Sequence, residues 1–87
     1  ADRKSTLVVG AGDATGGAIA RRFAREGYAV VCTRRDVTSL DPLLETIRGD
    51  GGEAHGFGSD ARDEDQVVEL FEKIERDIAP LEVLVFN

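Results

Sequence analysis

Glycines cluster in the loop that follows the first apolar segment of the sequence. Residues 6–9 are apolar or β-branched, and residues 10–17 read Gly-Ala-Gly-Asp-Ala-Thr-Gly-Gly. Glycines at such a place let a bulky phosphate approach the backbone, and the N–H groups that open a helix attract an anion. The strict dinucleotide pattern G-x-G-x-x-G is not met, because the third glycine falls one place late, at Gly16. The loop predicts a phosphate-binding turn, with a glycine-rich turn that binds no ligand as the alternative.

Two arginines follow the second apolar segment, residues 28–33. An acid about 20 residues past such glycines binds the ribose 2′-hydroxyl of NAD, whereas an arginine nearby accommodates the 2′-phosphate of NADP. Arg34 and Arg35 stand at this place, and two guanidiniums in a chain of formal net charge −6 suit a dianionic phosphate. The pair predicts NADP(H) rather than NAD. The alternative is a solvated turn in which the arginines pair with Asp36.

The elements that position these residues alternate between strand and helix. Buried strands are predicted by short apolar segments, at residues 6–9, 28–33, 53–57 and 83–86. Between them, apolar side chains recur at helical spacing from residue 18, within 40–47 and within 67–78. Such alternation demands parallel strands with right-handed crossovers. The predicted fold is therefore α/β, a doubly wound parallel sheet of element order βαβαβαβ and strand order 3-2-1-4, the first half of a Rossmann fold.

Composition narrows the class of protein. The chain has 87 residues with 11 Lys and Arg against 17 Asp and Glu, and this acidic balance disfavours a nucleic-acid or membrane-surface partner. No segment approaches the roughly 20 apolar residues that a membrane span needs. The single cysteine, Cys32, can form neither an internal disulfide nor a cysteine metal site, and we expect both Cys32 and His55 to be structural. We therefore expect no metal and a reducing, cytoplasmic setting.

The glycine loop resembles that of the short-chain dehydrogenases/reductases, which reads T-G-x-x-x-G-x-G. Gly10 matches the first glycine of that pattern and Gly16 the last. Val9 replaces the threonine and Ala14 the middle glycine, a change for which Gly12 offers compensation. The resemblance extends over nearly all 87 residues. It implies that the loop binds the cofactor through Gly10, Gly12, Asp13, Ala14, Thr15 and Gly16.

Two further motifs resemble those of the family. Asp60-Ala61-Arg62-Asp63 is similar to its D-V-x-D, in which the first Asp meets the adenine amino group and the next residue packs on the ring. We assign Asp63 to helix capping only. Residues 82–87 are similar to its D-x-L-V-N-N, with Asn87 at the second Asn. The resemblance thus implies that Asp60, Ala61 and Asn87 bind the cofactor, whereas outside the family Asp60 would be interpreted as a surface carboxylate.

The family also bears on the choice of cofactor. Its NAD-dependent members carry Asp at the position of Arg34, and its NADP-dependent members often carry Arg at that of Arg35. Asp13 argues mildly the other way, since NADP-preferring members often place a basic or hydroxyl residue there. We expect NADP as the cofactor and regard NAD as the less favoured choice.

The resemblance implies the NADP(H)-binding portion of an oxidoreductase that transfers a hydride between a nicotinamide cofactor and a small carbonyl or alcohol substrate, and that is a homo-oligomer at full length. Family catalysis uses Tyr-x-x-x-Lys with an upstream Ser, but the only tyrosine is Tyr28 and position 32 is Cys. Residues 1–87 are thus expected to be the N-terminal dinucleotide-binding part of a single Rossmann domain, without catalytic residues. The alternatives are a non-catalytic dinucleotide-sensing module and, less consistent with Arg34, a methyltransferase.

The fourth predicted strand has a consequence for the isolated chain. In strand order 3-2-1-4 its apolar residues 83–86 would form an exposed edge, which proteins normally avoid. We therefore expect these 87 residues alone to associate or to fold only partly, and the natural protein to continue past Asn87.

Overall fold

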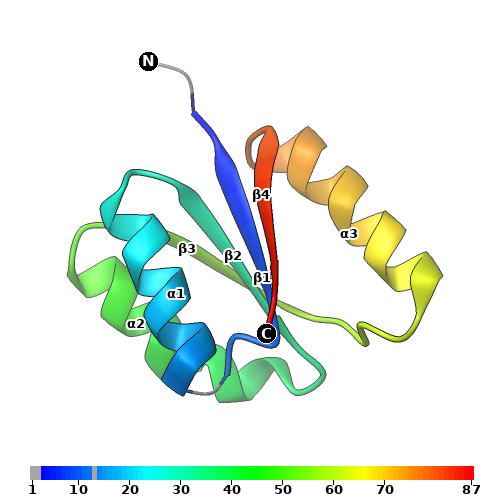
Figure 1. The fold of residues 1–87 in the computed structure, drawn as a ribbon, viewed down its shortest axis with the longest axis horizontal. Coiled ribbons are helices and arrows are strands. Elements are labelled where there is room, and N and C mark those ends of the chain that lie inside the picture. The colour runs from blue at the N-terminus through cyan, green and yellow to red at the C-terminus, as the bar shows by residue number, and fades with distance from the viewer. Residues whose placement is uncertain (1–2, 13) are drawn as a thin grey trace.

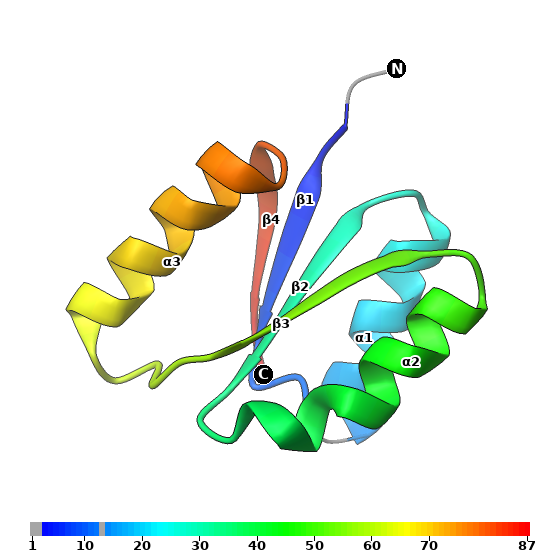
Figure 2. The same ribbon diagram turned by 180° about the vertical axis from the view of Figure 1, so that it is seen from behind.

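A four-stranded parallel sheet forms the centre of the structure, with helices on both faces. The computed structural model describes residues 3–12 and 14–87. Its elements, in chain order, are β1 (Ser5–Val9), α1 (Ala14–Arg25), β2 (Ala29–Arg34), the short 3₁₀ helix η1 (Val37–Leu40), α2 (Asp41–Gly49), β3 (Glu53–Gly58), α3 (Glu64–Asp77) and β4 (Leu81–Phe86). The strand order is β3-β2-β1-β4 and every pairing is parallel, which confirms the predicted fold class. Helices α1 and α2 lie on one side of the sheet and α3 on the other (Figure 1 and Figure 2).

Each face of the sheet has its own apolar core. Neighbouring residues of a strand point to opposite faces, so Val8 packs with Val30 under α1 and α2, whereas Leu7 packs with Val31 under α3. The second cluster is closed by Leu70 and other apolar side chains of α3. This arrangement explains why the first two apolar segments show no alternation with polar residues, since both faces of β1 and β2 are covered by helices.

Helix α1 begins four residues earlier than its apolar pattern indicates. The amphipathic spacing starts at residue 18, but the helix starts at Ala14 and takes in Gly16 and Gly17. Glycine adds nothing to an apolar pattern, so the sequence predicted a loop where the backbone is already helical. The 3₁₀ helix η1, which the sequence did not predict, continues directly into α2.

Helix α3 begins at the predicted cap. The carboxylate of Asp63 accepts hydrogen bonds from the backbone N–H groups of Asp65 (3.0 Å) and Gln66 (3.3 Å). The Gln66 side chain also contacts Asp63, but its Oε1 accepts from the N–H of Asp60 (3.0 Å). The cap therefore ties the end of the β3–α3 connection to the start of the helix.

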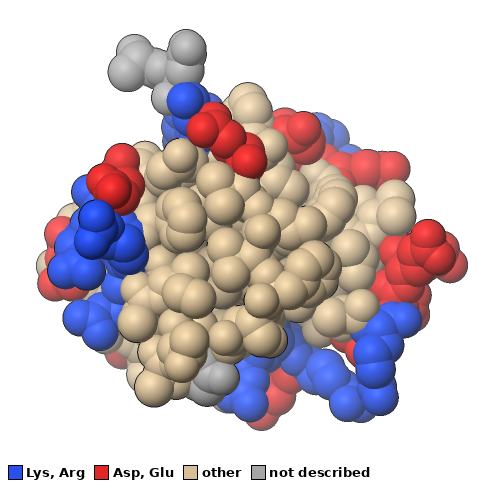
Figure 3. Space-filling view, viewed as in Figure 1, with Lys and Arg blue, Asp and Glu red and all other residues tan. Residues whose placement is uncertain are grey.

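Strand β4 is the edge strand beside β1. Its side chains alternate between half-buried and exposed, with Leu84 41% and Phe86 65% exposed. β4 lies toward the viewer in Figure 1, and the same view in Figure 3 shows charged side chains around the margin of this surface and none at its centre. The structure thus places an apolar edge where the sequence predicted one.

Candidate functional site

A pocket of about 540 Å³ lies where the strands end at their carboxyl side. In open α/β sheets this edge, at the point where strand order reverses, is the usual place for a ligand. In this sheet the chain adds β2 and β3 on one side of β1 and then places β4 on the other side. The strand order therefore reverses between β1 and β4. The pocket gathers six of the residues singled out in the sequence, namely Gly10, Arg34, Arg35, Asp60, Ala61 and Asn87.

The glycine loop is fastened to the end of β2. The N–H groups of Gly10 and Ala11 both donate to the carbonyl oxygen of Thr33, at 3.0 and 3.2 Å. Gly10 has φ of +80°, in the left-handed region where a side chain is strained, and a Cβ there would lie 3.1 Å from the carbonyl oxygen of Asn87. Residue 10 must therefore be glycine for the chain to turn here.

Gly16 lets the first turn of α1 pack directly on this loop. A Cβ at Gly16 would lie 2.7 Å from the Gly10 carbonyl oxygen and 2.9 Å from the Cα of Ala11. The side-chain amide of Asn87 donates to the same Gly10 oxygen at 3.0 Å, and the Asn87 N–H donates to the Val9 carbonyl at 3.1 Å. Helix start, loop and the residue after β4 are thus held in one compact turn.

Arg34 lies across the glycine loop. A Cβ on Gly12 would come within 2.1 Å of the Arg34 Cδ, so the absence of a side chain at Gly12 is what admits the arginine. The Arg34 Nη1 donates to the Ser39 hydroxyl oxygen at 3.2 Å, and that hydroxyl donates to the Asp36 carbonyl at 2.6 Å. From the sequence, Gly12 is expected to supply the backbone freedom that is lost where Ala14 replaces a glycine. In the structure, Gly12 instead leaves space for the Arg34 side chain.

Asp36 is hydrogen-bonded within the turn that follows β2. Its carboxylate accepts from the hydroxyl (2.7 Å) and the N–H (3.2 Å) of Thr38, and these hydrogen bonds lower the pKa of Asp36 below its ordinary value. Within residues 3–12 and 14–87, neither Arg34 nor Arg35 forms an ion pair within 4.0 Å. The structure therefore shows no close ion pair of either arginine with Asp36, although the charge of Arg34 also helps to lower the pKa of Asp36.

Asp60 lies at the end of β3 and carries a partner that the sequence analysis missed. Arg62 donates through its N–H (2.9 Å) and Nε (3.1 Å) to one carboxylate oxygen and through Nη2 (3.2 Å) to the other. These bonds, with the nearby charge of Arg35, lower the pKa of Asp60 from 3.8 to about 2. Arg62 also lines the pocket. The spacing Asp-x-Arg, which allows a side-chain turn of this kind, was the signal available in the sequence.

The remaining predicted residues lie beside the pocket. Gly12 and Ala14 line an adjacent hollow of about 380 Å³ between α1 and α2, which Ser39 also lines. Thr15 is exposed in the first turn of α1. Asp13 lies outside the described residues.

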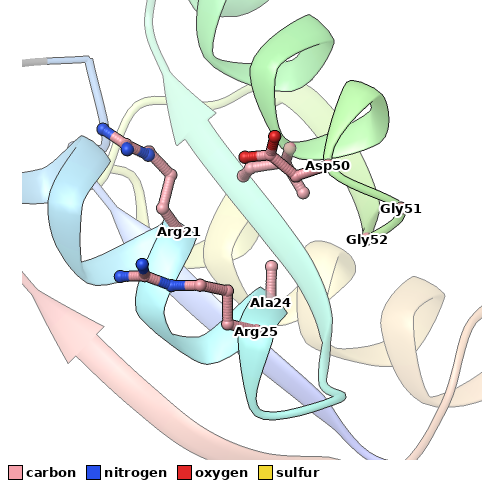
Figure 4. Close-up of a pocket in the computed structure, with 7 residues that line it drawn as sticks. Arg21, Ala24, Arg25, Asp50, Gly51 and Gly52 are labelled. Carbon is pink, nitrogen blue, oxygen red and sulfur yellow. The ribbon is translucent and has the colours of Figure 1, made fainter.

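A further hollow of about 250 Å³ lies between α1 and the end of α2 (Figure 4). Arg21 and Arg25 of α1 and Asp50 after α2 line it, together with the glycines that lead into β3. It lies at the edge where the strands begin, away from the carboxyl ends, and it contains none of the predicted site residues. We therefore do not regard it as the functional site.

Cys32 and His55 both have structural surroundings. Burial in the core beneath α1 and α2 raises the pKa of the Cys32 thiol to about 12, which leaves it protonated and unreactive. His55 Nε2 contacts a carboxylate oxygen of Glu53 at 2.7 Å. In the described part of the chain, no group of three or more His, Cys, Asp and Glu side chains could hold a metal ion, and no helix is long and apolar enough to cross a membrane.

The sheet order and the pocket at the carboxyl ends of its strands define a Rossmann-type α/β protein. Within that class the chain belongs to the short chain dehydrogenases, whose family model matches residues 4–87. Gluconate 5-dehydrogenase of Gluconobacter oxydans is 35% identical over 81 residues, which are 93% of this chain and 32% of that protein.

Two solved structures share the fold closely. A short-chain dehydrogenase from Rhodopseudomonas palustris is 40% identical with a TM-score of 0.92, covering 97% of this chain and 39% of that one. A variant of actinorhodin polyketide ketoreductase, crystallised with NADPH, is 32% identical with a TM-score of 0.88, covering 99% of this chain and 33% of that one. The chain thus spans only 26% to 32% of the length of curated relatives that it matches.

Proposed function

We propose that this chain is the NADP(H)-binding portion of a short-chain dehydrogenase/reductase. The observation that carries the proposal is the pocket itself, which joins the glycine loop, two arginines, Asp60 with Ala61, and Asn87 at the carboxyl edge of the sheet. Residues 1–87 would be the N-terminal, dinucleotide-binding part of a single Rossmann domain. The whole protein would act on a small carbonyl or alcohol substrate as a cytoplasmic homo-oligomer.

The glycine loop fits the pyrophosphate of a dinucleotide. The positive end of the α1 dipole favours an anion, and the missing side chains at Gly10 and Gly16 keep the turn tight enough for a phosphate to reach the backbone. Ala14 and Thr15, in the first turn of α1, would face the phosphates. Asn87 would keep the loop in place through its hydrogen bond to the Gly10 carbonyl.

The adenosine end of the cofactor fits the other side of the pocket. Asp60 has an ionised carboxylate that can accept from the adenine amino group, and Ala61 offers a small apolar surface for the ring. The ribose would lie toward the end of β2. The nicotinamide, when bound, would donate or accept the hydride, and no residue among these 87 is assigned a catalytic role.

Arg34 and Arg35 support a preference for NADP over NAD. A 2′-phosphate needs cationic donors, whereas a 2′-hydroxyl is bound by a carboxylate acceptor at the end of the second strand. The carboxylate closest to that place, Asp36, already accepts two hydrogen bonds from Thr38 and caps η1. The end of β2 thus presents two guanidiniums to the pocket, next to the Asp36 carboxylate, whose Oδ1 accepts both hydrogen bonds from Thr38.

The test is nucleotide binding by the natural full-length protein, measured by calorimetry with NADPH, NADH, 2′,5′-ADP and 5′-ADP. We expect at least about 10-fold tighter binding of the 2′-phosphorylated member of each pair, the difference that one charge-assisted hydrogen bond supplies. Equal affinities would remove the NADP preference, and no binding of any of the four would remove the dinucleotide function. Binding without hydride transfer to any of a panel of ketones and aldehydes would leave the sensing module as the function.

A further inference from the structure

We infer that Gly12 and Ser39, and not Arg34 alone, determine the preference for a 2′-phosphorylated nucleotide, because together they hold the Arg34 guanidinium across the glycine loop. This inference rests on the proposed NADP(H) function. It assigns a specificity role to Ser39, a residue of η1 that no sequence motif marks, and a new role to Gly12.

Gly12 provides the space in which the Arg34 side chain lies. A Cβ at position 12 would be 2.1 Å from Cδ, 2.5 Å from Nε and 2.3 Å from Nη1 of Arg34. The outer part of the Arg34 side chain therefore lies directly over this glycine. Gly12 does not have a positive φ, and its backbone conformation alone does not require glycine. The atoms that would collide belong to a flexible side chain, so a substitution at Gly12 would displace Arg34 rather than disrupt the fold.

Ser39 fixes the far end of the same arginine. Its hydroxyl donates to the Asp36 carbonyl at 2.6 Å, which turns its lone pairs toward the Arg34 Nη1 at 3.2 Å. The hydroxyl is therefore committed as an acceptor for Arg34. Because Asp36 caps η1 through Thr38, the turn that presents Ser39 is itself held by two hydrogen bonds.

The arrangement keeps the charge of Arg34 for a ligand. Its hydrogen-bond partner Ser39 is neutral, and within residues 3–12 and 14–87 Arg34 makes no ion pair within 4.0 Å. A guanidinium has five N–H donors, so one bond to a hydroxyl leaves donors for a dianionic phosphate. A carboxylate partner would compete with that phosphate, whereas a serine orients the arginine without neutralising it. A long side chain already held in place also loses less conformational freedom when the phosphate binds.

The experiment compares Ser39→Ala and Gly12→Ala with the parent in the natural full-length protein. The readout is the ratio of the dissociation constants for 5′-ADP and 2′,5′-ADP, which isolates the 2′-phosphate from any change in binding of the rest of the nucleotide. We expect each variant to reduce this ratio by about 3- to 10-fold, and Arg34→Ala to reduce it further, toward unity. Ser39→Thr, which retains the hydroxyl, is expected to keep most of the preference.

Gly49→Ala is the matched control, because a Cβ there meets nothing within 4 Å and the residue lies far along the chain from the pocket. The melting temperature of every variant, measured by circular dichroism, separates a displaced arginine from a disturbed fold. If Gly12→Ala has a lowered melting temperature, Ser39→Ala, which removes only an exposed hydroxyl, tests the inference. A parent protein with no preference for 2′,5′-ADP would overturn the proposed NADP function. If the parent shows that preference, two results would overturn the present inference alone. One is a preference that is undiminished in Ser39→Ala, and the other is a preference that falls as much in Gly49→Ala as in Ser39→Ala and Gly12→Ala.

Discussion

The sheet has two edges that differ in how completely the chain satisfies them. At the carboxyl edge, where the strands end, the loop N–H groups bind Thr33, Asn87 binds Gly10, and Asp60 binds Arg62. At the lateral edge, formed by β4, apolar side chains reach solvent without partners in the described part of the chain. The carboxyl edge is thus held by hydrogen bonds within these residues, whereas the β4 edge is apolar surface that a further element or another molecule could cover.

Asn87 lies where the two edges meet. It directly follows β4 and donates both to the Val9 carbonyl and, through its side chain, to the Gly10 carbonyl. The position of β4 beside β1 is therefore coupled to the shape of the glycine loop. The edges differ in that polar groups at the loop are hydrogen-bonded within the chain, whereas apolar side chains of β4 face water.

The largest effect is expected at Gly16. Gly16→Ala would place a Cβ 2.7 Å from the Gly10 carbonyl oxygen, a backbone atom, and the loop must shift to admit it. We expect a loss of about 1–3 kcal/mol in the free energy of unfolding. A displaced phosphate turn loses charge-assisted hydrogen bonds worth about 1.5–3 kcal/mol each, which would weaken NADPH binding by roughly 10- to 100-fold. Urea unfolding and calorimetry on the full-length protein measure both quantities.

Gly17→Ala is the matched control for that substitution. The neighbouring residue is also buried in α1, but its Cβ would make ordinary contact with Leu43 at 3.6 Å. Replacing a helical glycine by alanine stabilises a helix by about 0.5–1 kcal/mol. If Gly16→Ala and Gly17→Ala behaved alike, the close approach of helix and loop would not be what Gly16 provides.

The next largest effect is expected from Arg34→Asp. The change removes a charge-assisted donor, worth about 1.5–3 kcal/mol, and adds an acid that accepts from a ribose 2′-hydroxyl. The ratio of the 5′-ADP and 2′,5′-ADP dissociation constants should fall by about 100-fold, below unity. Arg25→Asp makes the same change in net charge beside the hollow at the opposite edge and should leave the ratio as it is. An equal fall in both variants would show that long-range charge recognises the phosphate, and an unchanged ratio in Arg34→Asp would show that this side chain does not contact it.

Most of the fold could be predicted from the sequence, because it depends on patterns that local chemistry determines. Doubly buried strands require continuous apolar segments, so β1 and β2 were recognisable. The apolar segment of β4 was also recognisable, although alternate side chains of this edge strand are exposed. The Asp63 cap marked the start of α3. The start of α1 was missed because Gly16 and Gly17 carry no side chains from which a helical pattern could be recognised.

The site residues were predicted better than the contacts among them. A glycine loop and a family motif indicate which residues gather at the carboxyl edge, but the direction of a long side chain depends on neighbours distant in sequence. Arg34 lies over Gly12 because of a turn fixed by Asp36 and Ser39, and Asp60 is bound by Arg62. The Asp-x-Arg spacing signals the second arrangement, whereas no spacing signals that Arg34 lies over Gly12.

At the lateral edge, Leu84→Lys tests whether the exposed apolar strand drives association of the isolated 87-residue chain. Leu84 is 41% exposed on β4, and charged side chains on an edge strand oppose pairing with another chain. Sedimentation velocity should show self-association of the parent and a weaker tendency in the variant, by about 10-fold in dissociation constant. Val37→Lys, at a 38% exposed site on η1, is the control and should associate as the parent does. A monodisperse parent monomer that unfolds cooperatively would contradict the expectation.

The smallest effect is expected from Arg62→Ala, which compares two charged groups at the carboxyl edge, Arg34 and Asp60. In the described residues Arg34 is hydrogen-bonded to the neutral Ser39, whereas the charge of Asp60 is balanced by Arg62. Removing Arg62 should return the pKa of Asp60 from about 2 toward 3.8, which ¹³C NMR of the carboxyl carbon can follow. Arg62→Lys, which retains charge without the paired N–H donors, should give an intermediate pKa.

The direction of the pH dependence follows from that shift. Because the folded-state pKa of Asp60 lies below its ordinary value, the pair with Arg62 favours the folded state above about pH 4, and this contribution is lost as the pH falls toward 2. Near neutral pH Asp60 is ionised with or without Arg62, so adenine binding should weaken by only a few-fold in Arg62→Ala, through lost orientation of the carboxylate. A large loss at pH 7 would mean that Arg62 itself contacts the nucleotide, and the two strand ends would then both present cationic charge to the ligand.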